Sequence, residues 1–306
     1  MIKVDDIAYV RFRAPDLGAM QAFLEDFGLV LADRDDKRLF MRGAGPAPFL
    51  HVTELGQAGF SAVGFRAKDS SDLESLAKSE GLEPTTLDGP GGGLMLRLTD
   101  PDGFSVEVVA GQQIRAPDSF PPRAAWNNSE GYLRKRATKR IASGPSHVVR
   151  LGHCVLSVSN FRASEAWYKE RLGFITSDEI ELQPGFAVGA FMRCDRGELP
   201  ADHHTLFLLQ GPKGPGFNHA AFEVRDLDDL MSGHAVLKGK SYTHEWGVGR
   251  HILGSQVFDY WRDPWGHTLE HWTDGDLFTA ADPPGKAGIP ELLGVQWGPA
   301  PPATMG

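Results

Sequence analysis

The segment from Val148 to Phe174 reads VVRLGHCVLSVSNFRASEAWYKERLGF, and it decides the fold because the chain contains its pattern twice. Its first part alternates apolar side chains, as a strand does, and its second part has the apolar spacing of an amphipathic helix. The segment from Asp5 to Leu29, DDIAYVRFRAPDLGAMQAFLEDFGL, repeats this pattern and ends in FGL where the other ends in LGF. A repeated strand–helix unit predicts two copies of one domain.

Two further pairs of segments follow in the same order in both halves. GFSAVGFRAKDSSDLESLAKSEGL begins at Gly59, and GFNHAAFEVRDLDDLMSGHAVLKGK begins at Gly216. LTDPDGFSVEVVAG begins at Leu98, and WRDPWGHTLEHWTDG begins at Trp261; proline and glycine in DPxG indicate a turn before a last strand. Each copy therefore contains two strand–helix–strands units.

This duplication predicts four parts of the chain. They are an N-terminal domain at 1–112, a linker at 113–147 rich in Pro, Asn, Ser and basic residues, a C-terminal domain at 148–280, and a tail at 281–306. The tail is rich in Pro and Gly but also holds an apolar cluster, so we expect it to dock as a lid rather than to be disordered.

The composition excludes several classes of protein. The chain has 306 residues, 41% of them hydrophobic, and a net charge of -9, which argues against a binder of nucleic acid or anionic membranes. The basic run RKRATKR lies in the linker and is expected to be a solvated connector. No apolar run is long enough to span a bilayer, so we expect a soluble, cytoplasmic protein. Cys154 and Cys194 lie in apolar segments and are expected to be buried free thiols.

Three candidate metal ligands lie on three strand-like segments: His153, His219 and Glu270. Two imidazoles and one carboxylate on one face of an octahedral ion leave the opposite face open, which suits iron(II), and manganese(II) accepts the same set. Because successive side chains of a strand point to opposite faces of a sheet, we expect Glu270 to face the opposite way from its neighbours, including His271. A carboxylate in an apolar strand needs a compensating partner, and a cation would supply one.

The N-terminal copy keeps only one of these three groups. Aligning the copies places Tyr9 opposite His153, Ala62 opposite His219, and Glu107 opposite Glu270. We therefore expect this copy to bind no metal and the chain to hold one metal ion in its C-terminal domain.

Over residues 5–280 the chain resembles the vicinal oxygen chelate superfamily, and within it the two-domain type I extradiol catechol dioxygenases. The resemblance rests on the ligand set and on three motifs: ADHHTLFLL with His204, GVGRHILG with His251, and VFDYWRDP with Tyr260. It implies an α+β fold of βαβββ modules, two per domain, that form two open barrel-like domains. It also implies that His153, His219 and Glu270 hold iron(II), or else manganese(II).

The resemblance further implies cleavage of a catechol ring beside its diol by dioxygen, as in the breakdown of aromatic compounds. His204 would stabilise the developing oxygen anion and then donate a proton, while His251 and Tyr260 would orient the substrate. Phe191 and Trp246 are candidates for the substrate pocket, with core packing as the alternative for both. We expect the partners to be a catecholic small molecule and dioxygen, with no nucleic acid or membrane, and the chain to form a homo-oligomer.

Other histidines carry less support from the sequence. His203 is expected to be a surface or packing residue, and His244 could lie in an outer layer around the site. No role is assigned to His51, His147, His234 and His267.

Two other functions and the kind of substrate remain open at this point. The rival functions are a metal-dependent isomerase, lyase or hydrolase of the same superfamily, and a non-catalytic ligand-binding module. Relatives that accept carboxylated catechols place arginines around the pocket. Here Trp246 stands near one such position, ELLGVQWGP contains no arginine, and only Arg196 or Arg250 could serve instead. We therefore expect a neutral aromatic substrate.

Overall fold

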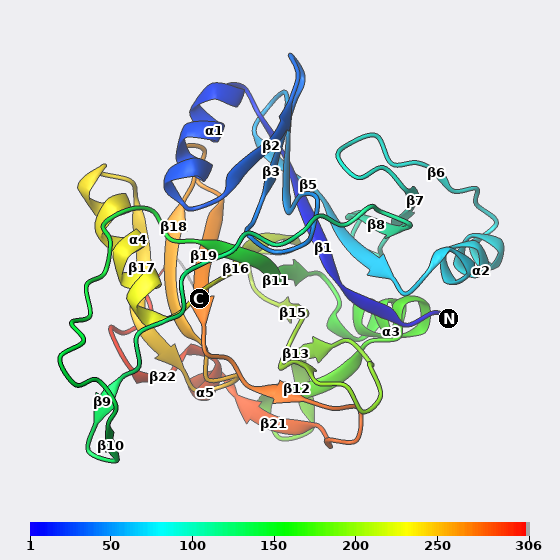
Figure 1. Ribbon diagram of the computed structural model, residues 1–306. Coiled ribbons are helices and arrows are strands. Elements are labelled where there is room, and N and C mark those ends of the chain that lie inside the picture. Colours follow the sequence, from blue (N-terminus) through cyan, green and yellow to red (C-terminus); the bar gives the residue numbers. More distant parts are fainter. Residues whose placement is uncertain (304–306) are drawn as a thin grey trace.

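The computed structural model describes residues 1–303, and the two halves of the chain fold in the same order of elements (Figure 1). The N-terminal half contains β1 (Val4–Ala14), α1 (Leu17–Asp26), β2 (Val30–Arg34), β3 (Arg38–Arg42), β4 (His51–Leu55), β5 (Gly59–Ala67), α2 (Ser70–Glu80), β6 (Thr85–Thr86), β7 (Leu94–Thr99) and β8 (Ser105–Ala110). A short hairpin of β9 (Asn127–Asn128) and β10 (Gly131–Tyr132) lies in the connecting segment.

The C-terminal half repeats this series and then extends it. It contains β11 (Val148–Val158), α3 (Phe161–Leu172), β12 (Ile175–Gln183), β13 (Phe186–Arg193), β14 (Ala201–Asp202), β15 (Leu206–Gln210), β16 (Gly216–Val224), α4 (Leu227–Gly239), β17 (His244–His251), β18 (Val257–Arg262), β19 (Thr268–Thr273) and β20 (Leu277–Phe278). The tail adds β21 (Gly285–Gly288), α5 (Ile289–Leu293) and β22 (Val295–Trp297).

Each half forms one large sheet, and the two sheets have the same strand order. The first has eight strands in the order β2-β3-β4-β1-β5-β8-β7-β6. The second has ten, in the order β21-β12-β13-β15-β11-β16-β19-β18-β17-β22. Without β21 and β22 the two orders correspond strand for strand, and each half is a pair of βαβββ modules. The predicted α+β fold and the internal duplication are confirmed.

Local sequence explains where the first helix of each half begins. Asp16 and Asn160 are the N-caps of α1 and α3, and their side chains accept hydrogen bonds from backbone N–H groups of the first turn. Gly173 ends α3 in the left-handed region at φ 73°, where a glycine avoids the strain that a Cβ would cause. The capped helices pack on sheets whose inward residues are apolar, which is the pattern that the two repeats predicted.

The two halves share a continuous hydrophobic core. Phe12 of β1 packs edge-on against Phe217 of β16, with ring centroids 5.1 Å apart, and Phe60 stacks on Phe217 at 4.7 Å. His271 of β19 donates a hydrogen bond to the carbonyl oxygen of Phe27 at 2.6 Å. The N-terminal half therefore supports the back of the sheet that carries the candidate ligands. Cys154 and Cys194 are buried free thiols, as predicted.

The tail completes the second sheet at both of its edges. β21 pairs in parallel with β12 at one edge, and β22 pairs antiparallel with β17 at the other. α5 lies between these two strands in the sequence, so the tail passes from one edge of the curled sheet to the other, as the orange and red ribbon of Figure 1 shows. The tail thus docks, as expected, and its role as a lid stays a prediction.

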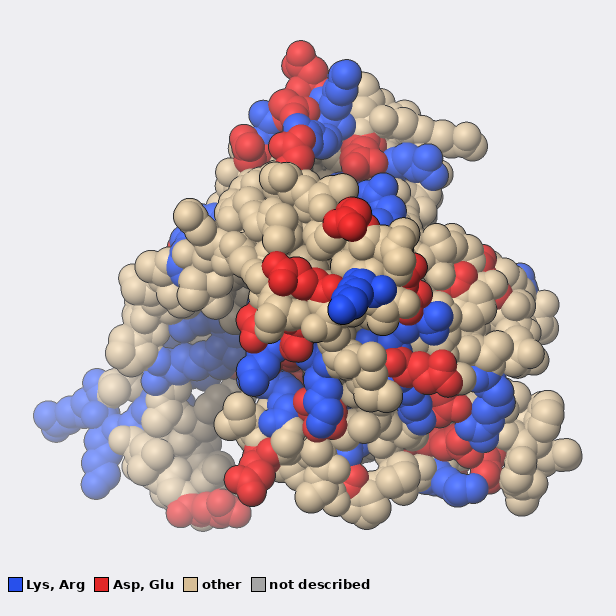
Figure 2. All heavy atoms as spheres, turned by 90° about the vertical axis from the view of Figure 1, so that its right-hand side faces the viewer, with Lys and Arg blue, Asp and Glu red and all other residues tan. Residues whose placement is uncertain are grey.

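The surface carries charged side chains of both signs. Figure 2 shows basic and acidic side chains interleaved over the front of the face that it displays. None of the helices in residues 1–303 combines the length and apolar character needed to span a bilayer.

Candidate metal centre

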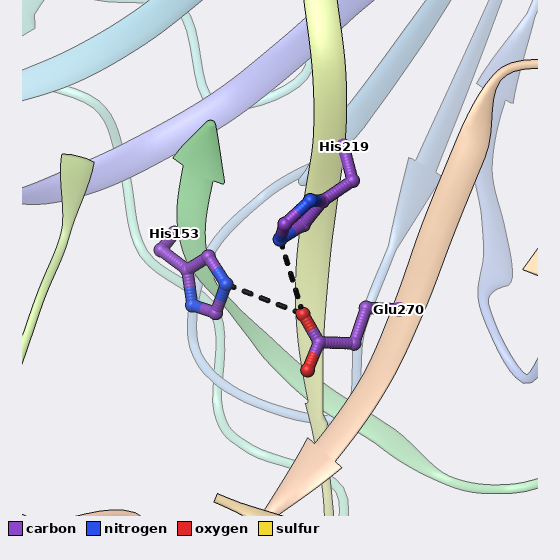
Figure 3. A group of neighbouring side chains, drawn as sticks. All are labelled: His153, His219 and Glu270. Carbon is purple, nitrogen blue, oxygen red and sulfur yellow. Dashed lines mark ion pairs between the residues drawn. The ribbon is translucent and has the colours of Figure 1, made fainter. Parts of the chain in front are cut away.

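The three predicted ligands meet because of the register of three adjacent strands. On β16, Ala221 pairs with His153 of β11 on one side and with Glu270 of β19 on the other. His219 lies two residues before Ala221 and therefore projects from the same face. Figure 3 shows the three side chains converging from their separate strands.

A bulge in β11 helps to aim His153. The pairing with β16 shifts between Leu151 and His153, which leaves Gly152 as the extra residue. A Cβ at Gly152 would lie 2.5 Å from Cζ2 of Trp272, so only glycine fits against this ring. Bulges next to active sites often redirect a side chain in this way.

The distances between the ligand atoms suit a metal ion. Nε2 of His153 and Nε2 of His219 each lie 3.3 Å from the same carboxylate oxygen, Oε2 of Glu270. Three donors about 2.1 Å from one ion are separated by roughly 3.0 to 3.4 Å, depending on octahedral or tetrahedral geometry. Within the described residues, neither carboxylate oxygen of Glu270 makes a hydrogen bond of good geometry, although the side chain is 0% exposed. A buried, unsatisfied carboxylate facing two imidazoles fits a divalent cation.

The pKa shifts of Glu270 and His153 favour metal binding at neutral pH. Burial pushes the pKa of Glu270 up, but the imidazoles of His153 and His219 outweigh it and leave that pKa well below its usual range. Burial lowers the pKa of His153. Nδ1 of His219 lies 2.8 Å from Oδ1 of Asn218 and can donate a hydrogen bond to it. The lone pair of Nε2 then remains free for a metal ion. An outer hydrogen bond of this kind fixes the tautomer of a ligating histidine.

His204 lies beside this trio, and its position depends on a residue that the sequence had not identified. Its ring is 4.0 Å from that of His153, and its Nδ1 is 3.0 Å from Nδ1 of His203. Nε2 of His203 is in turn 2.6 Å from Oδ2 of Asp178 on β12. His203 is only 1% exposed, so of the two expected places, the surface or the packed interior, it occupies the packed interior. It links the Asp178 carboxylate to His204.

His251 and Tyr260 form a hydrogen-bonded pair on the other side of the trio. Tyr260 pairs with Glu270 across β18 and β19, and with Trp246 across β17 and β18. One transverse line of the sheet therefore runs from His153 through Glu270 to Tyr260 and Trp246. The Tyr260 hydroxyl lies 3.0 Å from Nε2 of His251. Burial, and then the charge of Glu270, raises the pKa of Tyr260 well above its usual range, so it remains a phenol that can donate a hydrogen bond.

A cavity opens on these side chains. The predicted residues that line it are His153, His204, His219, His251, Tyr260, Phe191 and Trp246. Leu292 and Leu293 of the tail also line it, as expected for a tail that docks near the cavity, whereas sequence reasoning missed Val155, Phe207, Leu209, Asn218, Leu253 and Gln256. Most of the wall is aliphatic or aromatic, and no arginine or lysine of the described chain lines it.

Three other residues considered from the sequence lie elsewhere. Nε2 of His244 is 2.8 Å from the carboxylate of Asp259, and His244 does not line the cavity. The guanidinium of Arg250 donates to Ser255 and Asp274, while that of Arg196 donates to Pro200. The cavity therefore receives no positive charge from either arginine.

The N-terminal half replaces the metal-binding groups with guanidinium groups. Tyr9, Gly64 and Glu107 occupy the register positions of His153, Ala221 and Glu270. The Tyr9 hydroxyl donates to Glu107 at 2.5 Å, and Arg11 and Arg97 donate to it at 3.0 and 2.6 Å. Burial alone would raise the pKa of Glu107, but the charge of Arg11 and these hydrogen bonds keep it below its usual range. This carboxylate already has its counter-charge.

Comparison with known proteins agrees with this architecture. Residues 150–271 match the Glyoxalase/Bleomycin resistance protein/Dioxygenase superfamily. It is similar to metapyrocatechase 2 from Cupriavidus necator, with 29% identity over 307 residues that cover 97% of this chain and 89% of that protein.

Two solved structures share the fold across the chain. The Mn(II)-bound glyoxalase from Novosphingobium aromaticivorans superposes with a TM-score of 0.80 at 25% identity, covering 100% of this chain and 95% of its own. Homoprotocatechuate 2,3-dioxygenase from Arthrobacter globiformis gives a TM-score of 0.74 at 21% identity, covering 94% and 85%. The predicted resemblance to two-domain extradiol dioxygenases is confirmed.

Proposed function

We propose that the protein is an extradiol dioxygenase that opens the ring of a neutral catechol beside its diol, with iron(II), or alternatively manganese(II), held by His153, His219 and Glu270. The observation that carries the proposal is the convergence of both imidazole ligands, His204, and the His251–Tyr260 pair on one cavity. The relative aligned over 97% of the chain is a metapyrocatechase, which supports ring cleavage over isomerase, hydrolase or non-catalytic functions.

The ligand set fits the metal and leaves part of its coordination sphere free. A bound divalent iron or manganese would accept the two catechol oxygens and dioxygen side by side and allow electrons to pass between them. All remaining steps depend on side chains of this protein, which bind the substrate, orient it and move its protons.

His204 is assigned the proton transfers. Burial, together with the neighbouring imidazoles of His153 and His203, lowers the pKa of His204 well below its usual range, so it is neutral at pH 7. Its Nδ1 faces His203, so Nε2 remains free to take a proton from the substrate and return it later. The carboxylate of Asp178 behind His203 would hold the ring in this tautomer and stabilise the positive charge that it acquires.

His251 and Tyr260 are assigned to orientation of the diol. The Tyr260 phenol can donate to one catechol oxygen, and its hydrogen bond to His251 fixes the direction of that hydroxyl. The ring of Trp246 lies nearly parallel to that of Tyr260, at 5.5 Å and 16°, and keeps this wall flat. A flat wall suits an aromatic substrate bound in one plane.

The proposal that the substrate is neutral rests on the residues of the cavity wall. Phe191, Phe207, Leu253, Leu292 and Leu293 offer no group that could pair with a carboxylate on the aromatic ring. Burying an unpaired carboxylate there would cost several kcal/mol (~2–7, depending on the reference state). Methyl, alkyl or aryl substituents would instead gain from burial.

The test begins with protein loaded anaerobically with iron(II) or manganese(II). Oxygen uptake and the absorbance of a conjugated semialdehyde are then followed with 4-methylcatechol, 2,3-dihydroxybiphenyl, a trihydroxybenzene and homoprotocatechuate. We expect uptake with the neutral catechols and the lowest kcat/KM with homoprotocatechuate. Absence of uptake with every catechol and both metals would refute the activity, whereas a preference for homoprotocatechuate would refute only the substrate class.

A further inference from the structure

We propose that the protein has, beyond the one metal ion expected from the sequence, a second metal site for zinc or a similar transition-metal ion, formed by His234, His244 and Asp259. His234 lies on α4, His244 is the first residue of β17, and Asp259 lies on β18. Asp259 precedes Tyr260, so strand alternation directs it to the opposite face of the sheet from the cavity. The site is therefore separate from the catalytic trio and lies behind the hairpin that carries His251 and Tyr260.

The donor atoms are close enough to share one ion. Oδ1 of Asp259 lies 2.8 Å from Nε2 of His244 and 3.2 Å from Nδ1 of His234, and all the donor atoms lie within 4.8 Å of one another. Donors about 2.1 Å from an ion are roughly 3.0 to 3.4 Å apart, which is close to both distances from Oδ1 of Asp259. The corresponding distances in the catalytic trio are 3.3 Å.

The carboxylate is prepared for this role by its surroundings. Asp259 is 0% exposed, and its other oxygen, Oδ2, accepts a hydrogen bond of 2.6 Å from Nε1 of Trp261. This bond holds the carboxylate in place, as outer hydrogen bonds do in metal sites, although Oδ2 also lies 3.1 Å from Nδ1 of His234. Burial pushes the pKa of Asp259 up, but the two imidazoles and the Trp261 N–H outweigh it, so the group remains ionised.

The site is open to solvent on the side of the imidazoles. The side chain of His244 is 32% exposed and that of His234 is 16% exposed. An ion can therefore enter, and water can fill the remaining coordination positions. Two imidazoles and one carboxylate are typical ligands of zinc, and they also accept cobalt, nickel or copper.

Occupancy would join three consecutive elements of the chain. The ion would tie α4 to both strands of the β17–β18 hairpin. Because ligands that bind only the folded state raise its stability, zinc should raise the melting temperature through this site. The alternative is a cluster held by hydrogen bonds alone, in which Asp259 accepts from both imidazoles and no metal binds at micromolar concentration.

The test counts metal ions and does not depend on catalysis. Chelator-treated full-length protein without an affinity tag is dialysed against micromolar zinc chloride, and zinc per chain is measured. We expect two zinc ions in the unaltered protein, one in His234→Asn/His244→Gln, and one in His153→Gln/His219→Gln. Asparagine and glutamine place an amide nitrogen near the positions of Nδ1 and Nε2, so they preserve hydrogen bonds to Asp259 but bind metal poorly.

Controls keep the result interpretable. His147→Asn removes an exposed histidine paired with Asp229 and should still give two zinc ions. Circular dichroism and oxygen uptake after iron loading would verify that His234→Asn/His244→Gln is folded. In the His153→Gln/His219→Gln background, zinc should still raise the melting temperature. One zinc per chain in the unaltered protein, or two in His234→Asn/His244→Gln, would overturn the proposal.

Discussion

Replacing His204 with phenylalanine is expected to lower kcat while preserving the shape of the cavity. The ring of His204 lies 4.0 Å from that of His153 and 4.8 Å from that of Phe191, so another aromatic ring fits the same space. Positioned acid–base groups contribute about 10²- to 10⁴-fold. The barrier should therefore rise by roughly 3 to 5 kcal/mol, at about 1.36 kcal/mol per tenfold. Loss of the contact with buried His203 should also reduce stability by about 1 to 3 kcal/mol.

The assay separates binding from turnover. Metal content, anaerobic binding of 4-methylcatechol and KM should change little, because the substitution removes neither a metal ligand nor a wall of the cavity. Asp178→Asn is the matched variant, because it keeps His204 but removes the charge behind His203. We expect kcat to fall about 10- to 100-fold there, as for other outer hydrogen bonds around metal sites. A His204→Phe enzyme with a kcat within tenfold of the unaltered protein would refute the assigned proton transfers.

Three further predictions concern stability and the tail. Arg11→Met should lower the free energy of unfolding in urea by about 3 to 5 kcal/mol, because it removes the buried cation that is paired with buried Glu107. Arg97 has a side chain that is 58% exposed, so Arg97→Gln should lower it by at most about 1 kcal/mol. Equal losses in the two variants would contradict this account. Truncation after Asp282 removes two edge strands and part of the cavity wall, so KM should rise and the melting temperature should fall. If both quantities stayed unchanged, the tail would not be a lid. Burial lowers the pKa of His51 to about 3 from 6.5, so the unfolded chain binds this proton first as pH falls. The free energy of unfolding of the metal-free protein should therefore fall by up to about 1.4 kcal/mol per pH unit below pH 6.5 through this group. In His51→Phe the free energy of unfolding should fall less steeply with decreasing pH, and an unchanged slope would contradict the assignment.

The sequence was sufficient for those parts of the fold and site that repeat. Apolar alternation and helical spacing are local properties, so two copies of the pattern predicted two similar domains, and the family resemblance implied their βαβββ modules. Alternation also predicted that Glu270 and His271 face opposite ways, and His271 indeed bonds to Phe27 in the other half. The convergence of His153 and His219 with Glu270 could be expected from the resemblance, in which the two histidines lie on the first strands of successive modules and the glutamate on a last strand.

The groups that the sequence did not reveal depend on contacts between distant segments. Asp178 and His203 are 25 residues apart and meet only because β12 lies beside the loop that carries His203. Adjacent histidines indicate that one of them faces the cavity, but they do not indicate what holds the other. Asp259 resembled an ordinary charged residue of an aromatic strand, and its partners His234 and His244 come from a helix and another strand. One signal of such a contact was present in the sequence, because Arg11, the partner of Glu107, is a charged residue in an apolar strand.

A comparison of the two halves of the protein indicates the charge of the ion that would bind beside Glu270. Both place a fully buried glutamate on the same register line of the same sheet, and neither glutamate can remain ionised without a positive partner. Glu107 has two guanidinium groups, one from Arg11 and one from Arg97, whose register position corresponds to Tyr260. All ion pairs of Glu270 within the described residues are with imidazoles. Where the N-terminal half supplies its own cations, the C-terminal half thus offers a negative pocket, and the fold supports a divalent ion at that position.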